Sequence, residues 1–194
     1  MIPAATEYVR ARSIEEAVRE LRDKGPEART LAGGHSLIPM MKLRMAAPQL
    51  LVDISAIPEL QGVSVQGQEL RLGATTTHAV IEHHPTVAKT LPLMAEIAGC
   101  IADPLVRNRG TIGGALANAD PSADWPVAAL LFDAQLDIAG PDGARVEAAI
   151  EFFQGLYATS LAPDELLTGI RLRIPDAQYR GAYEKVRHPA SGYA

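Results

Sequence analysis

The spacing of apolar residues predicts a chain of short helices and strands. The clearest helix covers residues 13–24, where apolar side chains recur at helical spacing and form one buried stripe. Those side chains are Ile14, Ala17, Val18 and Leu21. Ser13 and Glu16 form a capping box at its start, and Gly25-Pro26 ends it.

The same spacing and the turn-forming residues predict the other elements. Further helices are expected at 37–45, around 79–81, at 86–99 with a new start at Pro92, at 125–132 and at 150–153. Thr76 or Thr77 is expected to cap the second of these, and Ser122 or Asp124 the helix at 125–132. Strands are expected at 28–31, 50–54, 63–66, 69–72, 135–138, 144–148, 166–174 and 181–186. Helices and hairpins are mixed without a regular βαβ alternation, which favours an α+β fold with a small lobe at 1–57 and a second lobe at 58–194.

Charge and cysteine content narrow the function classes. The chain has 18 Lys and Arg against 23 Asp and Glu, a net charge of −5, which argues against nucleic acid or an anionic membrane as its main partner. No apolar run approaches the roughly 20 residues that cross a bilayer, so no integral membrane segment is expected. Cys100 is the only cysteine, which excludes an intrachain disulfide and a cysteine-ligated iron–sulfur cluster and fits a cytoplasmic setting.

Two glycine-rich stretches carry the candidate chemistry. Residues 107–124 are the densest run of small and turn-forming residues, and Gly110, Gly113 and Gly114 are expected to allow positive φ and close approach to a ligand. Residues 32–36 follow a predicted strand and precede a predicted helix, a geometry that suits phosphate. Such loops aim backbone N–H groups at an anion, although a plain surface loop also explains the first stretch.

Together these stretches resemble a known family, the FAD-binding medium subunit of molybdenum hydroxylases of the carbon monoxide dehydrogenase and xanthine dehydrogenase type. The matching residues are 32–44, 107–114 and 119–124, with support from 73–76 and 183–186. The resemblance implies a two-lobed FAD-binding fold of the vanillyl-alcohol-oxidase (PCMH) type that lacks the family's C-terminal domain. It implies partners as well: a molybdopterin-binding large subunit and a [2Fe–2S] small subunit, in a heterohexamer built as a dimer of heterotrimers.

The resemblance also assigns site residues. The pyrophosphate contacts map onto Ala32, Gly33, Gly34, His35 and Ser36, and the second FAD loop maps onto Thr111, Ile112, Gly113, Gly114 and Ala115. Asp124, Leu161 and Lys185 match further FAD contacts, and Ile101 and Tyr193 match walls of the isoalloxazine site. No catalytic base and no metal ligand is expected in this chain.

One departure and two alternatives accompany this interpretation. Ala115 stands where the family often has Asn or Ser, so one side-chain contact is expected to be missing. His35 lies in a Gly-Gly-His-Ser context, in which some free-standing flavin oxidases attach the flavin covalently. A nucleotide-binding module without flavin is the other alternative. In the favoured interpretation the subunit takes electrons from partner clusters and passes them to an external acceptor.

Overall fold

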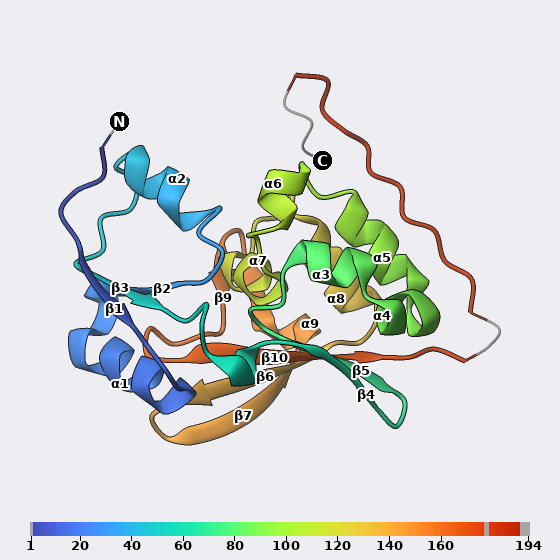
Figure 1. Cartoon of the computed structure of the whole chain (residues 1–194), viewed down its shortest axis with the longest axis horizontal. Coiled ribbons are helices and arrows are strands. Elements are labelled where there is room, and N and C mark those ends of the chain that lie inside the picture. The colour runs from blue at the N-terminus through green and yellow to red at the C-terminus, as the bar shows by residue number, and fades with distance from the viewer. Residues whose placement is uncertain (1, 177–178, 191–194) are drawn as a thin grey trace.

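The computed structural model describes residues 2–176 and 179–190, and its strands form a small and a large sheet (Figure 1). The small sheet has the order β1-β3-β2, with all three strands parallel. The bounds are β1 Glu7–Arg10, β2 Ala28–Leu31 and β3 Leu50–Asp53. Helix α1 (Ile14–Lys24) packs on it, and Ser13 Oγ accepts a hydrogen bond from the Glu16 N–H at 3.2 Å. The predicted capping box at this helix is therefore confirmed on the Ser13 side.

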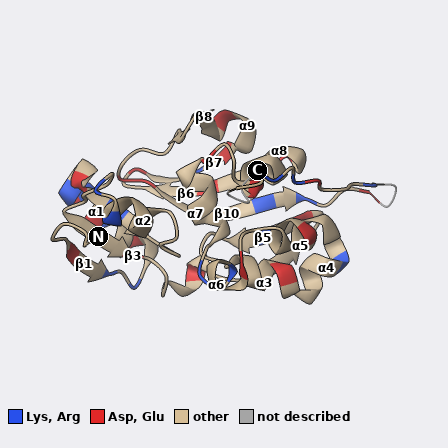
Figure 2. Ribbon diagram, turned by 90° about the horizontal axis from the view of Figure 1, so that it is seen from above, with Lys and Arg blue, Asp and Glu red and all other residues tan. Residues whose placement is uncertain are grey.

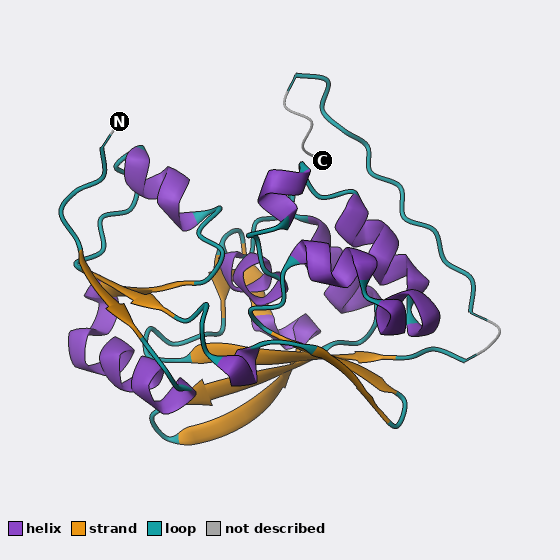
Figure 3. Ribbon diagram, in the orientation of Figure 1, coloured by secondary structure: helices purple, strands orange, loops and turns teal. Residues whose placement is uncertain are grey.

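The large sheet is antiparallel and carries most helices on one face (Figure 3). Its order is β4-β5-β10-β6-β7, with bounds β4 Val63–Gln66, β5 Glu69–Gly73, β6 Gln135–Gly140, β7 Gly143–Ala148 and β10 Leu166–Arg173. The covering helices are α3 His78–His83, α4 Pro85–Thr90, α5 Pro92–Gly99, α7 Ile112–Asn118 and α8 Asp124–Leu131. Helices gathered on one face of an antiparallel sheet give an α+β fold.

Short elements complete the chain. These are α2 Leu37–Lys42, α6 Pro104–Arg107, α9 Ala149–Phe152, the 3-10 turns η1 Gly25–Glu27 and η2 Pro58–Leu60, and a two-stranded ribbon of β8 Phe153–Gly155 and β9 Ala158–Thr159. In the described part of the chain, no helix has the length and apolar character needed to cross a membrane. Acidic and basic residues are interspersed over both sheets and the helices (Figure 2).

The buried apolar residues form two separate cores. The larger core fills the space between the large sheet and its helices around Trp125, Met94 and Leu136. The smaller core joins α1 to the small sheet through Leu21 and Val52. Leu166, the first residue of β10, belongs to the smaller core although it lies in the large sheet. The two sheets are thus joined by packing as well as by the chain.

The periodic elements agree with the sequence, whereas two local predictions are wrong. The hairpin around Gly67-Gln68, the new helix at Pro92 and the Thr77 cap are confirmed. Helix α8, however, has Ala123 as its N-cap without a side-chain bond, and Ser122 instead bonds Asp120 through its N–H and hydroxyl, both at 2.9 Å. An Asx turn competes with the cap for the same short side chains.

The predicted strand at 181–186 is also wrong. These residues run as an extended segment along the helices, with no strand assigned (Figure 1). Tyr183 and Lys185 are partly buried, whereas their neighbours in the chain are exposed. The alternation of buried and exposed positions that the sequence suggested is therefore present. It reflects side-chain anchoring to the helices rather than backbone pairing with another strand.

Candidate functional site

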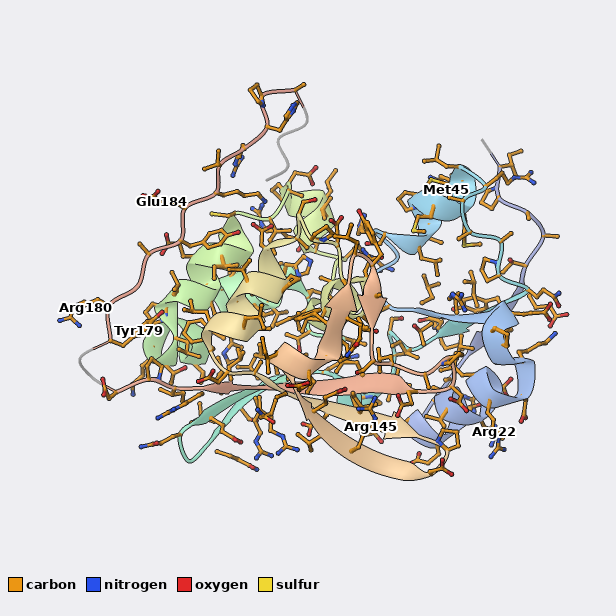
Figure 4. The ribbon with its side chains drawn as sticks, turned by 180° about the vertical axis from the view of Figure 1, so that it is seen from behind. Arg22, Met45, Arg145, Tyr179, Arg180 and Glu184 are labelled. Carbon is orange, nitrogen blue, oxygen red and sulfur yellow. The ribbon has the colours of Figure 1, made fainter. Side chains whose placement is uncertain are left out.

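A large cleft lies between the α2 side of the small sheet and the helices of the large sheet. Its volume is about 1230 Å³, above the roughly 300–1,000 Å³ typical of small-molecule pockets. Both glycine-rich stretches line it, as does the end of the extended segment at Lys185. Met45, just past α2, lines it from the small-sheet side, and its position there is labelled in Figure 4. A ligand of dinucleotide size therefore has room between the two halves of the molecule.

The first glycine stretch links β2 to α2 and offers a run of backbone donors. The N–H groups of residues 33–37 have no acceptor among the described residues. Gly34 has a φ of 76°, which favours glycine and turns the chain into α2. Several consecutive unpaired N–H groups at a cleft wall are the donor set that a phosphate needs.

The two glycine stretches touch each other. A Cβ on Gly33 would lie 2.1 Å from the Arg109 carbonyl oxygen and 2.8 Å from Gly110 Cα. Both obstacles are backbone atoms, so they cannot swing aside as a side chain would. Glycine at position 33 is required for the two stretches to meet at the cleft.

The second glycine stretch is the start of a helix rather than an open loop. Thr111 Oγ1 caps α7 by accepting a hydrogen bond from the Gly114 N–H at 3.1 Å. The Ile112 N–H donates to Thr76 O at 3.1 Å, and the Gly113 N–H donates to Ala74 O at 2.9 Å. These N–H groups therefore fix α7 to the segment before α3.

The glycines of this stretch serve packing, which corrects the expected role of positive φ. Gly110, Gly113 and Gly114 are not among the glycines with positive φ. A Cβ on Gly113 would lie 2.6 Å from both the Cβ and the carbonyl oxygen of Ala74. Gly114 instead faces the cleft, where the nearest atom of the opposite stretch is Ala32 Cβ, 3.9 Å from a Cβ built on Gly114.

A buried ion pair closes one wall of the cleft. Asp124 Oδ2 accepts from Lys185 Nζ at 2.8 Å, and the two side chains are only 6% and 7% exposed. Tyr183 donates its hydroxyl to Asp124 Oδ1 at 2.5 Å, and Lys185 also reaches Cys100 O at 3.3 Å. Burial, followed by the hydrogen bond to Asp124, raises the pKa of Tyr183. Asp124 and Lys185 thus neutralise each other and hold the extended segment on the helices.

A second buried pair lies next to Asp124 on α8. Trp125 Nε1 donates to His78 Nδ1 at 3.0 Å, and His78 also lines the cleft. Burial lowers the pKa of His78 to about 4, so its ring is neutral near pH 7. Sequence reasoning missed His78. The signal was its spacing to Ile81, one helical turn on, since both residues face inward from α3.

Thirteen of the fifteen predicted site residues line the cleft. They are Ala32, Gly33, Gly34, His35, Ser36, Ile101, Thr111, Gly113, Gly114, Ala115, Asp124, Leu161 and Lys185. Ile112 does not, because its side chain is 2% exposed and belongs to the larger core. Tyr193 lies outside the described residues.

Arg107 and the two threonines before Thr77 have structural roles. Arg107 donates to Glu82 Oε2 at 2.8 Å and to Ile101 O at 3.0 Å, which fixes α6 to α3 and to the cleft wall. The Thr75 and Thr76 hydroxyls donate to Leu60 O and Gly62 O. These threonines therefore hold the turn before α3.

Comparison with known proteins identifies the family. A family model described as the FAD binding domain in molybdopterin dehydrogenase matches residues 4–176. The chain belongs to this family. The carbon monoxide dehydrogenase medium chain of Afipia carboxidovorans is 43% identical over 194 residues, which is 100% of this chain and 67% of that protein. This FAD-binding chain therefore spans about two thirds of the length of that relative.

Solved structures agree with this assignment. Carbon monoxide dehydrogenase from Hydrogenophaga pseudoflava superposes with a TM-score of 0.97 at 44% identity, over 100% of this chain and 68% of that one. Quinoline 2-oxidoreductase from Pseudomonas putida 86 gives a TM-score of 0.94 at 34% identity, over 100% and 67%.

The residues of the cleft fit FAD, the family's cofactor. The unpaired N–H groups at 33–37 suit its pyrophosphate, and the cleft is large enough to hold a dinucleotide. The chain is thus the flavin-binding component of an oxidoreductase.

Proposed function

We propose that this chain is the electron-transfer subunit of a molybdenum hydroxylase complex in the cytoplasm. It accepts electrons from [2Fe–2S] clusters of a small partner subunit and passes them to an external acceptor. A molybdopterin-binding large subunit oxidises the substrate. The carbon monoxide dehydrogenase medium chain, at 43% identity, supports the assignment to such a complex, and the expected assembly is a dimer of heterotrimers.

The observation that carries the proposal is the cleft that both glycine stretches line. FAD bound there supplies two-electron chemistry, whereas the protein supplies position and electrostatics. The N–H groups at 33–37 bind the pyrophosphate, and Gly114 lines the wall formed by the second stretch. Thr111 caps α7 and so fixes that wall. Charge-assisted bonds from backbone donors let an acidic chain hold an anion without a cluster of lysines.

The residues of this chain indicate which steps of electron transfer it can carry out and which need a partner subunit. With one cysteine it cannot ligate a [2Fe–2S] cluster by itself, so electrons arrive from another chain. Asp124 and Lys185 are paired with each other, which makes them part of the cofactor wall rather than proton-transfer groups. We propose that the fold is of the vanillyl-alcohol-oxidase type and that the lobe boundary lies near Ile57-Pro58. The substrate is set in another subunit.

Purification from the native host tests the proposal. We expect a flavin-containing complex in which this chain elutes with a cysteine-rich small chain and a molybdopterin chain in equal amounts. Substrate added to that complex should bleach the visible flavin absorbance. Removal of the small chain should stop the bleaching, while a chemical reductant still bleaches the isolated flavoprotein. Substrate-driven bleaching of this chain alone would overturn the electron-transfer role.

The free-standing oxidase with flavin attached to His35 is the second candidate, favoured by the position of His35 on the cleft wall. Acid precipitation separates the two. We expect the yellow colour to leave the pellet, because FAD is held without a covalent bond. A yellow pellet that turns colourless in the variant His35→Ala would establish the covalent alternative.

A further inference from the structure

His78 is a polar group on the cleft wall that the proposed FAD contacts do not include. It is the first residue of α3 and is only 5% exposed, yet it lines the cleft. Its backbone N–H donates to Gly110 O at 3.0 Å, and its Nδ1 accepts from Trp125 Nε1 at 3.0 Å. The His78 backbone is therefore fixed to the second glycine stretch, and its imidazole is fixed to α8.

The bond from Trp125 determines which ring nitrogen carries the proton. An indole N–H only donates, so His78 Nδ1 must be the acceptor. A neutral imidazole then has its proton on Nε2. The ring stays neutral near pH 7 because burial, reinforced by the charges of His35 and Arg107 and opposed by Asp124, keeps its pKa low. Nε2–H is consequently a fixed hydrogen-bond donor.

That donor has no protein acceptor among the described residues, and its position explains why. A Cβ built on Gly110 would lie 2.7 Å from Nε2, so the Gly110 backbone packs closely against this edge of the ring and only a glycine fits there. Tyr179 Oη is fully buried without a hydrogen-bond partner in the described part of the chain, whereas His78 Nε2 is not fully buried. His78 lines the cleft, so a ligand bound there lies next to its ring.

We propose that His78 Nε2–H donates a hydrogen bond to an oxygen or nitrogen acceptor of the bound FAD, with Trp125 as the positioning residue. The inference rests on FAD binding in this cleft. A ligand that fills the cleft removes water from Nε2, and a buried donor left unpaired is costly. A neutral N–H avoids the desolvation cost of a charged donor at the same place. The arrangement thus adds one directional donor from α3 to the N–H groups at 33–37.

Three variants test the donor role by FAD titration of flavin-stripped protein. His78→Phe keeps a ring without the N–H, and we expect FAD to bind about 5- to 10-fold more weakly. His78→Gln retains an N–H donor and should recover part of that affinity. Trp125→Phe leaves the ring but frees its tautomer, so a smaller loss is expected. His83→Gln, an exposed histidine on the same helix, is the matched control and should bind like the unmodified chain.

Unfolding midpoints and the visible spectrum of the bound flavin separate this role from a structural one. A histidine that only satisfies Trp125 would lower the unfolding midpoint in His78→Phe without changing the dissociation constant or the spectrum, and that result would overturn the proposal. Unchanged affinity in His78→Phe with normal FAD binding by the unmodified chain overturns this inference alone. Failure of the unmodified chain to bind FAD overturns the cofactor site and this inference together.

Discussion

Acidification should destabilise the protein through His78 at a pH where the carboxylates are still ionised. The folded chain holds His78 neutral with a pKa of about 4, against 6.5 for the free group. Below pH 6.5 the unfolded chain binds a proton that the folded chain does not, so unfolding becomes easier as the pH falls. The contribution is fully present above pH 6.5 and is lost as the pH falls toward 4.

The size of the effect follows from the pKa difference. One pKa unit corresponds to about 1.4 kcal/mol, so the loss of unfolding free energy is about 2 kcal/mol by pH 5 and about 3 kcal/mol by pH 4. That is a large share of the roughly 5–15 kcal/mol that stabilises a typical domain. Asp53 and Glu165 have lowered pKa values and lose their contributions only as the pH falls below about 4.5. The window from pH 7 to pH 5 therefore isolates His78.

Urea unfolding at pH 7, 6 and 5, with the same flavin content throughout, measures this slope. The unmodified chain should lose about 2 kcal/mol over the range, whereas His78→Phe should lose much less, whatever its absolute stability. His83→Gln removes an exposed histidine and should keep the full slope. Equal slopes in the unmodified chain and in His78→Phe would refute the assignment of the acid sensitivity to His78.

Three further substitutions test the cleft. Gly33→Ala should abolish FAD binding, measured by flavin retention on purification, because its Cβ would lie 2.1 Å from Arg109 O; full flavin retention would contradict the contact between the two stretches. Lys42→Ala, on the exposed side of α2, should retain flavin and serves as the control. Asp124→Asn should cost about 3–5 kcal/mol in urea unfolding, since Lys185 would remain buried without its partner charge. It should also speed tryptic cleavage of residues 179–190, and an unchanged digestion pattern would mean that the ion pair does not anchor the segment.

The sequence predicted those parts of the fold that depend on residues close together in the chain. Helix α1, the β4–β5 hairpin and the break at Pro92 depend on spacing and turn residues within a few positions, and the structure confirms them. Strand β1 was missed, because it is mostly exposed and is held by pairing with β3, more than forty residues later. The alternation at 181–186 resembled a strand because anchoring side chains also repeat every second residue.

The sequence indicated the two glycine stretches of the candidate site but not the contacts that they make in the fold. Gly33 and Gly113 are both required, but for different contacts. A Cβ on Gly33 would collide with the Arg109 carbonyl, and a Cβ on Gly113 would collide with Ala74. No pattern in the sequence states which backbone atom a glycine approaches. His78 escaped attention for a similar reason, since its partner Trp125 lies 47 residues further along. The roles of these glycines and of His78 both depend on contacts between residues far apart in the sequence.

The place of Leu166 in the smaller core has a consequence for synthesis. Ile57 and Leu60 pack in the same core, yet Leu166 is made about a hundred residues later. At roughly 5–20 residues per second, the small sheet waits several seconds on the ribosome with part of its apolar surface uncovered. The N-terminal part of this chain therefore keeps apolar surface uncovered while the rest is still being translated.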